Sequence, residues 1–174
     1  MRYIAFLRAI NVGKHNRIRM EDLRVLCSEA GLEDVQTYLQ TGNVLFETKL
    51  TEMKAATLIE ETLAGHGLRN VVAAVRPKQE LAALIATNAF TNHPMPEYGQ
   101  LVTLFRDPLP EAARELAVST PGVVAVTQRE VCAFIDRAQP GPRDVNGALE
   151  KRFKVQGTTR YWHVVEAAAA LLGG

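Results

Sequence analysis

The order in which apolar and amphipathic segments follow each other along residues 1–77 constrains this chain more than any single motif. Continuous apolar runs of about five residues are typical of buried strands, whereas apolar residues that recur every three or four positions indicate helices. Thr41-Gly42-Asn43 is a tight-turn sequence between two short apolar runs, so it predicts a hairpin. The expected elements are strands at residues 3–7, 35–39, 44–46 and 71–75 and helices at residues 20–30 and 51–65. This β-α-β-β-α-β order is that of the split βαβ, or ferredoxin-like, fold.

The second half repeats most of this order after a loop at residues 88–99 that contains two prolines. The expected elements are a short helix near residues 81–85, a strand at 101–105, a helix at 107–118, hairpin strands at 123–126 and 131–135, a short helix at 146–153 and a last helix from Thr158. We therefore predict an α+β protein with two ferredoxin-like (split βαβ) units in tandem and an additional C-terminal helix. The first unit covers residues 1–77, a helix and connecting loop cover 78–99, and the second unit with its C-terminal helix covers 100–174.

The composition is that of a folded protein with a core. Of the 174 residues, 47% are hydrophobic and 22% are charged, which excludes a disordered tail, a collagen-like chain and a disulfide mini-protein. The formal net charge is only +1, but the charges are unevenly spread. Residues 1–24 and residues 137–160 each hold six basic and two acidic side chains, whereas the segment between them is acidic. If the fold brings the two basic segments together, they create a local positive field.

Other sequence features bear on the compartment and on metal binding. Cys27 and Cys132 lie far apart in apolar stretches and form no CxxC pair, so we expect two buried thiols in a reducing compartment. The four histidines lack the spacing of a metal site, and we predict none. The apolar run at residues 3–7 ends at Arg8, so it is too short for a signal peptide or a membrane span. We therefore expect a cytoplasmic protein without a membrane partner. The sequence indicates no particular cofactor or oligomeric state.

The loop after the first strand carries the first candidate binding residues, which are Arg8, Asn11, Gly13, Lys14 and Asn16. Ligands of α/β proteins often lie beyond the carboxyl ends of strands. Gly13 permits a close backbone approach, Lys14 supplies a cation, and free backbone N–H groups in such a turn form an anion-binding nest. The pattern is not a GxxxxGK phosphate-binding loop, because Arg8 stands where the first glycine is required and His15 follows Lys14. The alternative is a polar surface loop in which Gly13 only permits the turn.

Two further segments are candidates for the same site. At the hairpin tip these are Gln40, Gly42 and Asn43, and the alternative is that Gly42 and Asn43 only form the turn. In the expected last helix, Thr159 is an N-cap and Arg160 stands in the first turn, where a cation is electrostatically unfavourable. This position favours an anion at that helix end. The alternative is that Arg160 pairs with a carboxylate and that Trp162 belongs to the core.

Several segments together resemble a known family. Residues 7–13 are Leu-Arg-Ala-Ile-Asn-Val-Gly, residues 37–46 are Thr-Tyr-Leu-Gln-Thr-Gly-Asn-Val-Leu-Phe, and residues 158–165 are Thr-Thr-Arg-Tyr-Trp-His-Val-Val. With Asn88-Ala89-Phe90, they resemble the signatures of the bacterial domain-of-unknown-function family 1697. The resemblance implies two ferredoxin-like α+β units in tandem and no established activity. The family usually has Gly, Gly, Ser, Pro, Asn and Thr where this chain has Ala9, Lys14, Thr41, Ala89, Tyr161 and Val164.

Three functions are compatible with these residues. The first is an uncharacterised cytoplasmic protein that binds a small anionic ligand, phosphate-bearing or nucleotide-like, in a pocket shared by Arg8 and Arg160. The second is a nucleic-acid-binding protein that uses the same basic segments, with Phe6 and Phe46 as stacking aromatics, although two aromatics on a sheet are more typical of a core. The third is an enzyme acting on a phosphorylated or acyl substrate, for which His15 is the only loop candidate for a general base. The sequence identifies no catalytic residue.

Overall fold

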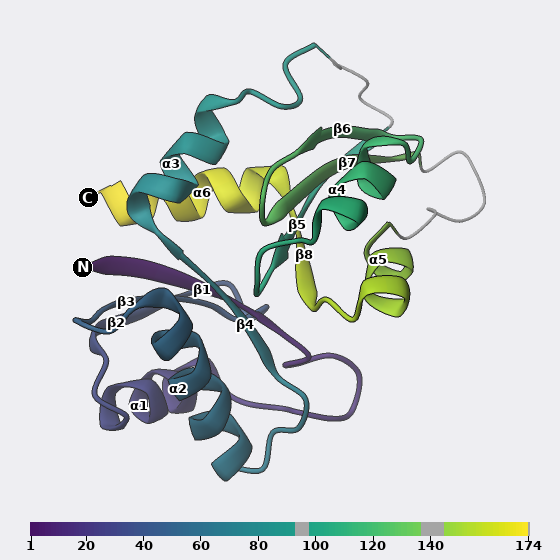
Figure 1. The fold of residues 1–174 in the computed structure, drawn as a ribbon. Helices are drawn as coiled ribbons and strands as arrows, with labels where there is room; N and C mark the ends of the chain where they lie inside the picture. Colours follow the sequence, from purple (N-terminus) through teal and green to yellow (C-terminus); the bar gives the residue numbers. More distant parts are fainter. Residues whose placement is uncertain (93–97, 137–144, 174) are drawn as a thin grey trace. The chain divides into compact units, whose positions relative to one another are not determined.

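The computed structural model describes residues 1–92, 98–136 and 145–173 (Figure 1). Within these ranges, the elements of the first half are β1 (Arg2–Arg8), α1 (Met20–Glu29), β2 (Glu33–Tyr38), β3 (Asn43–Glu47), α2 (Glu52–Gly65), β4 (Val72–Pro77) and α3 (Lys78–Ala86). Those of the second half are β5 (Tyr98–Phe105), α4 (Glu111–Val118), β6 (Val123–Val126), β7 (Glu130–Asp136), α5 (Val145–Phe153), β8 (Gly157–Tyr161) and α6 (Trp162–Gly173).

The chain divides into two compact units. The first unit holds residues 1–83 together with the chain from Ala168 onward, and the second unit holds residues 84–167. This division does not test which segments fold by themselves. The domain boundaries expected from the sequence, at residues 77 and 99, therefore stay a prediction.

The first sheet is antiparallel and has the strand order β2-β3-β1-β4. β1 pairs with β3 on one side and with β4 on the other, and Arg8 lies opposite Val72 at its end. Because side chains alternate across a strand, Tyr3, Ala5 and Leu7 share one face, and they belong to a core that also contains side chains of α1 and α2. The two helices therefore cover this face, and the loop that follows Arg8 leaves from a central strand.

The predicted order of the first half is confirmed in its elements. The tight turn at Thr41-Gly42-Asn43 joins β2 and β3 as expected. Thr51 is the N-cap of α2, and its hydroxyl accepts a hydrogen bond from the Lys54 N–H at 3.4 Å. The short helix expected near residues 81–85 is α3.

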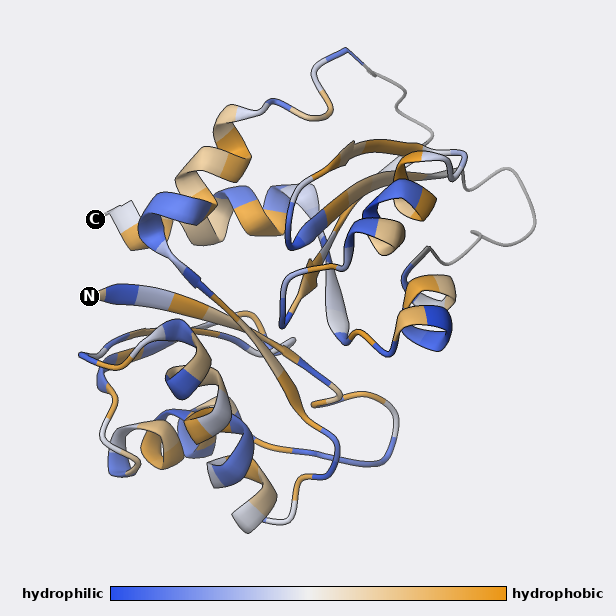
Figure 2. Cartoon of the chain, viewed as in Figure 1, coloured by the Kyte–Doolittle hydropathy of each residue, from blue (hydrophilic) through white to orange (hydrophobic). Residues whose placement is uncertain are grey.

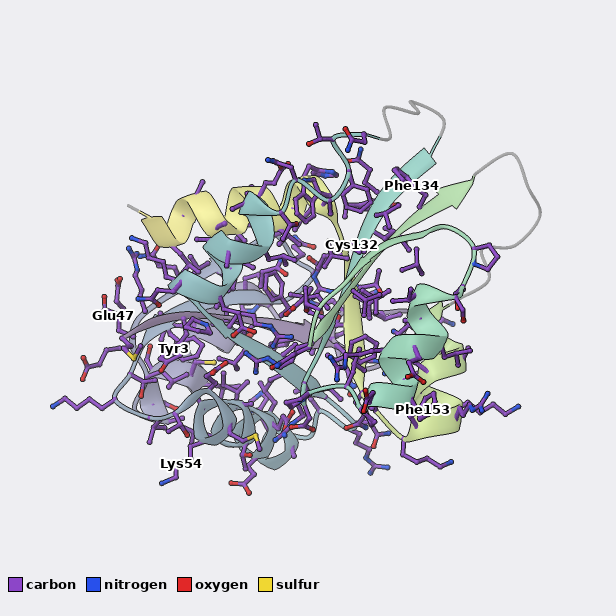
Figure 3. The ribbon with its side chains drawn as sticks, turned by 45° about the horizontal axis from the view of Figure 1, so that its top comes forward. Tyr3, Glu47, Lys54, Cys132, Phe134 and Phe153 are labelled. Atoms are coloured by element: carbon purple, nitrogen blue, oxygen red, sulfur yellow. The ribbon has the colours of Figure 1, made fainter. Side chains whose placement is uncertain are left out.

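The second sheet is also antiparallel and has the strand order β6-β7-β5-β8. Phe105 at the end of β5 packs in a core with Ala113 and Ala117 of α4 and Leu149 of α5. β6 and β7 are largely hydrophobic in Figure 2, and β7 carries Cys132 and Phe134 (Figure 3). Two four-stranded antiparallel sheets with helices make the chain an α+β protein, as the sequence predicts.

The prediction of a last helix from Thr158 is wrong at its start. Residues 157–161 form β8, which pairs with β5, and helix α6 begins only at Trp162. Thr158 and Thr159 are β-branched and favour a strand that has a partner. The Thr159 hydroxyl lies 2.9 Å from the hydroxyl of Thr103 on β5. Gly157 fits closely at the start of this pairing, because a Cβ atom there would lie 3.0 Å from Phe105 Cδ1 and 3.1 Å from the Leu104 carbonyl oxygen, so its neighbours would have to shift by a few tenths of an ångström.

Candidate functional site

The loop between β1 and α1 is held in an unusual backbone conformation. Its φ angles are positive at Ala9 (65°), Asn11 (53°), Gly13 (61°) and Asn16 (51°). Asparagine and glycine tolerate this left-handed region better than other residues do. The Asn11 N–H donates to the Asn16 carbonyl oxygen at 2.9 Å and closes the loop between these two residues. Gly13 and Lys14 are exposed at its tip.

Asn11 joins this loop to the hairpin tip. Its side-chain amide donates to the carbonyl oxygens of Ile18 and Gln40, each at 3.0 Å, and its side-chain oxygen accepts from the Ile18 N–H at 2.9 Å. The structure therefore brings Asn11 beside the backbone of Gln40, and the role of either side chain in ligand binding stays a prediction. The hydrogen-bonding groups of the Asn11 side chain are already engaged by the backbone.

Asn16 joins the same loop to the segment that connects α2 and β4. Its side-chain amide donates to the carbonyl oxygens of Ala9 and Arg69, each at 2.7 Å. Its side-chain oxygen accepts from the Arg69 N–H at 2.9 Å. Both backbone groups of Arg69 are thus held by one side chain, which fixes residue 69 beside the β1–α1 loop.

At the hairpin tip, Gly42 and Asn43 have structural roles. The Gly42 carbonyl oxygen accepts from the Leu7 N–H at 2.8 Å, and a Cβ atom on Gly42 would lie 2.3 Å from Ile10 Cδ1. Asn43 is fully buried and donates to the Tyr38 carbonyl oxygen at 2.8 Å. These contacts support the turn-forming alternative, and a ligand contact at either residue stays a prediction.

Two neighbouring hollows lie where these segments meet in the first unit. The first hollow, of about 420 Å³, is lined by polar and charged side chains and by two apolar ones; its lining residues are Asn11, Arg17, Arg19, Asp22, Gln40, His66, Ile18 and Met20. The second hollow, of about 410 Å³, is lined by His15, Asn16, Gly67, Arg69 and Asn70. Asn16 and Gly67 of the second hollow are the chain neighbours of Arg17 and His66 of the first, so the two hollows lie near each other in the first unit. Both volumes lie in the range of small-molecule sites.

The charges of the two hollows differ. In the first, Arg19 donates two hydrogen bonds of 2.9 Å to the Asp22 carboxylate, and these bonds hold the pKa of Asp22 below its ordinary value. The second hollow contains no carboxylate among its lining residues. Among the residues that the structure describes, none forms an ion pair with Arg17, Lys14 or Arg69. The second hollow therefore holds a cation, Arg69, with no carboxylate in the lining to compete with an anion, whereas Asp22 lines the first hollow.

Arg8 and Arg160, which the binding hypothesis places in one pocket, belong to different compact units. Arg8 ends β1, whereas Arg160 lies in β8, so the argument from an anion at a helix start is wrong for Arg160 and Thr159. The Arg160 guanidinium donates to Thr158 Oγ1 at 2.7 Å and to the Thr159 carbonyl oxygen at 3.0 Å. Burial lowers the pKa of Arg160 to about 10, so its side chain stays charged at neutral pH. A pocket shared with Arg8 stays a prediction.

Sequence reasoning did not select most of the lining residues, among them the basic side chains Arg17, Arg19, His66 and Arg69. Arg17 and Arg19 belong to the basic segment at residues 1–24, which was the available signal. His66 and Arg69 come about fifty residues later, and no local pattern connects them with the β1–α1 loop. The Asn16 side chain connects Arg69 with this loop through long-range hydrogen bonds that are not visible in the sequence.

Two phenylalanines of the first sheet and the two cysteines are buried. Phe6 and Phe46 are both 0% exposed, so the prediction that they belong to a core is confirmed. Cys27 and Cys132 are buried as expected, and desolvation raises their pKa values to about 11 and about 12. The described residues hold no cluster of three or more His, Cys, Asp or Glu side chains that could bind a metal ion. Among the described helices, none has the length and apolar character needed to cross a membrane.

Comparison with known proteins places the chain in a protein family whose function is not established. The chain belongs to the family described as proteins of unknown function, DUF1697, whose profile matches residues 1–134. The family resemblance seen in the sequence is thereby confirmed. No curated protein matches the chain. Its structure is similar to that of the conserved bacterial protein SP0830 from Streptococcus pneumoniae, with a TM-score of 0.68, 17% sequence identity and 98% of each chain covered. At this identity the likeness shows the fold alone.

Proposed function

We propose that the first unit binds a small anionic ligand, phosphate-bearing or nucleotide-like, with its anionic group in the second hollow. The observation that carries this proposal is the lining of that hollow, which consists of His15, Asn16, Gly67, Arg69 and Asn70. The Arg69 guanidinium forms no ion pair with any described residue. A guanidinium matches the geometry of a phosphate and forms charge-assisted hydrogen bonds with it.

The backbone around Arg69 supports the same proposal. Asn16 holds both the N–H and the carbonyl group of Arg69, so the cation is attached to a fixed part of the loop. A site that is already ordered loses less conformational freedom when a ligand binds. The nearby end of α2 does not oppose an anion strongly, because its last carbonyl groups accept hydrogen bonds from the N–H groups of His66, Gly67 and Leu68.

We also infer that each unit is ferredoxin-like. The order of elements is β-α-β-β-α-β in both units, and the strand orders β2-β3-β1-β4 and β6-β7-β5-β8 correspond strand for strand. In this arrangement the β1–α1 loop and the α2–β4 loop lie at one end of the first sheet. The pairing of Arg8 with Val72 supports this placement, since it puts the end of β1 beside the start of β4.

The test is a thermal-shift titration of the full chain with inorganic phosphate at constant ionic strength. A ligand that binds only the folded state raises the unfolding midpoint as its concentration exceeds the Kd. We expect this rise in the unmodified protein and in Lys54→Gln, which removes a charge from an exposed site on α2 (Figure 3). Arg69→Gln is expected to lose most of the rise. An Arg69→Gln protein that responds to phosphate like the unmodified protein contradicts the proposal.

The same titration separates the anion-binding proposal from binding to nucleic acid. A protein that tracks a phosphate backbone loses affinity steeply between about 50 and 200 mM salt, because it releases condensed counterions. A compact pocket for one phosphate group responds mildly over this range. Short oligonucleotides that bind with the steep dependence, while inorganic phosphate does not bind, would favour the nucleic-acid alternative. An enzyme remains the third alternative, with His15 of the second hollow as its candidate base.

A further inference from the structure

We infer, on the basis of the proposed anion-binding function, that the ligand is a phosphate monoester whose organic group carries no second phosphate. Its phosphate group lies in the second hollow and its organic group lies in the first hollow. Residues that line the two hollows are consecutive in the chain at Asn16 and Arg17 and again at His66 and Gly67, so the hollows lie near each other. In this inference, one molecule of nucleotide size spans both.

The first hollow does not favour a second phosphate group. Asp22 is among its lining residues, and the Arg19 guanidinium is already paired with this carboxylate at 2.9 Å. Helix α1 begins at this hollow, and its positive end already has Glu21 and Asp22 in the first turn. These acidic residues offset the positive end of the helix dipole. Only Arg17 remains as a cation without a carboxylate partner among the described residues of this hollow.

The other lining residues of the first hollow suit an organic group. Ile18 and Met20 supply apolar surface, and Met20 is only half-buried. The exposed Gln40 side chain offers one amide oxygen and two N–H donors. The Asn11 amide cannot take the same role, because its donors are bound to the carbonyl oxygens of Ile18 and Gln40. An apolar wall beside an amide that both donates and accepts fits a sugar or a nucleoside.

The experiment compares the affinities of three probes for the full chain, which are inorganic phosphate, adenosine 5′-monophosphate and pyrophosphate. We expect the monophosphate ester to bind about tenfold more tightly than inorganic phosphate, because it adds apolar burial and a hydrogen bond. Gln40→Ala is expected to weaken the ester about fivefold and to leave inorganic phosphate unchanged. Arg69→Gln is expected to weaken both probes. Gln79→Ala, which truncates an exposed glutamine on α3, serves as the matched control.

The outcomes separate the two proposals. If inorganic phosphate and the ester bind equally and Gln40→Ala changes neither, the organic group has no place in the first hollow and this inference fails while anion binding stands. If pyrophosphate binds more tightly than the ester, the first hollow accepts a second phosphate and the inference is again wrong. If none of the three probes binds, both proposals fail.

Discussion

The role of Gly42 can be measured through the substitution Gly42→Ala. Residue 42 has a φ angle of +81°, and the added Cβ atom would lie 2.3 Å from Ile10 Cδ1 and 3.0 Å from Leu7 Cβ. Both neighbours are buried, with exposed fractions of 3% for Ile10 and 1% for Leu7, so neither can move aside freely. The substitution therefore combines backbone strain with overpacking.

The two costs can be separated with Gly13→Ala as the control. Gly13 has a similar φ angle of +61°, but an added Cβ atom there meets nothing within 4 Å. We expect Gly13→Ala to lower the free energy of unfolding by about 0.5–1 kcal/mol. The strain of alanine in the left-handed region destabilises the folded state, and the lower conformational entropy of alanine in the unfolded chain offsets part of this loss. Gly42→Ala adds an overpacking cost of about 1–3 kcal/mol. Its total cost is then about 1.5–4 kcal/mol.

Urea unfolding followed by circular dichroism, together with calorimetry, measures this difference. A loss of about 1 kcal/mol lowers the thermal midpoint of a chain of this size by about 2–4 °C. Gly42→Ala should therefore melt several degrees below Gly13→Ala. Equal midpoints for the two variants would refute the packing argument for Gly42 and would leave its ligand role as the better explanation of a glycine at the hairpin tip.

Three further predictions concern the loop strain, the thiols and the buried arginine. Ala9→Gly should raise the free energy of unfolding by about 0.5–1 kcal/mol in urea, because Ala9 has a φ angle of 65°; a lower stability would show that this conformation carries no strain. At pH 8 the thiol of Cys27, whose pKa burial raises to about 11, should be ionised about a hundredfold less than an ordinary thiol. Cys27 and Cys132 should thus react with a disulfide reagent only as fast as the protein unfolds, and fast labelling of the native protein would contradict their burial. Arg160→Ala should lower the urea midpoint by the equivalent of about 1–3 kcal/mol, since it removes internal hydrogen bonds to Thr158 and Thr159; an unchanged midpoint would show that these bonds do not stabilise the fold.

Local sequence signals predicted the first unit well. The signals for this unit depend on residues close to each other in the chain; they are continuous apolar runs, helical spacing, the Thr51 cap and the glycine turn at residue 42. The elements that they predict are confirmed, because the same pattern that favours each element locally also buries it in the core. The fold class follows from the order of these elements.

The start of the last helix could not be predicted in the same way. Residues 158–172 combine threonines that can cap a helix with an apolar helical pattern, so local signals favour one long helix. The strand at Gly157–Tyr161 forms because β5 offers it a partner about 55 residues earlier in the chain. Strand pairing over such a distance depends on the assembled sheet and not on local propensity.

The candidate site, too, could be predicted from the sequence only where it depends on local segments. The β1–α1 loop and the hairpin tip were each expected from the sequence as candidate binding segments, but the contact that Asn11 makes between them was not. Arg69 was not expected, because it joins the site through the hydrogen bonds of Asn16 across 53 residues of sequence. His66 was not expected either, and it lines the first hollow from the end of α2. The asparagines of the loop, which the sequence offers as ligand-binding groups, instead use their side chains to hold the backbone.

The central claim, that the second hollow binds an anion, is tested most directly by amide NMR of the full chain during a titration with inorganic phosphate. We predict that the largest shift changes occur at the N–H groups of His15, Asn16, Gly67, Arg69 and Asn70, and that they saturate together. Changes that cluster instead around Arg160 and β8, or that spread over exposed lysines without saturating, would contradict the account.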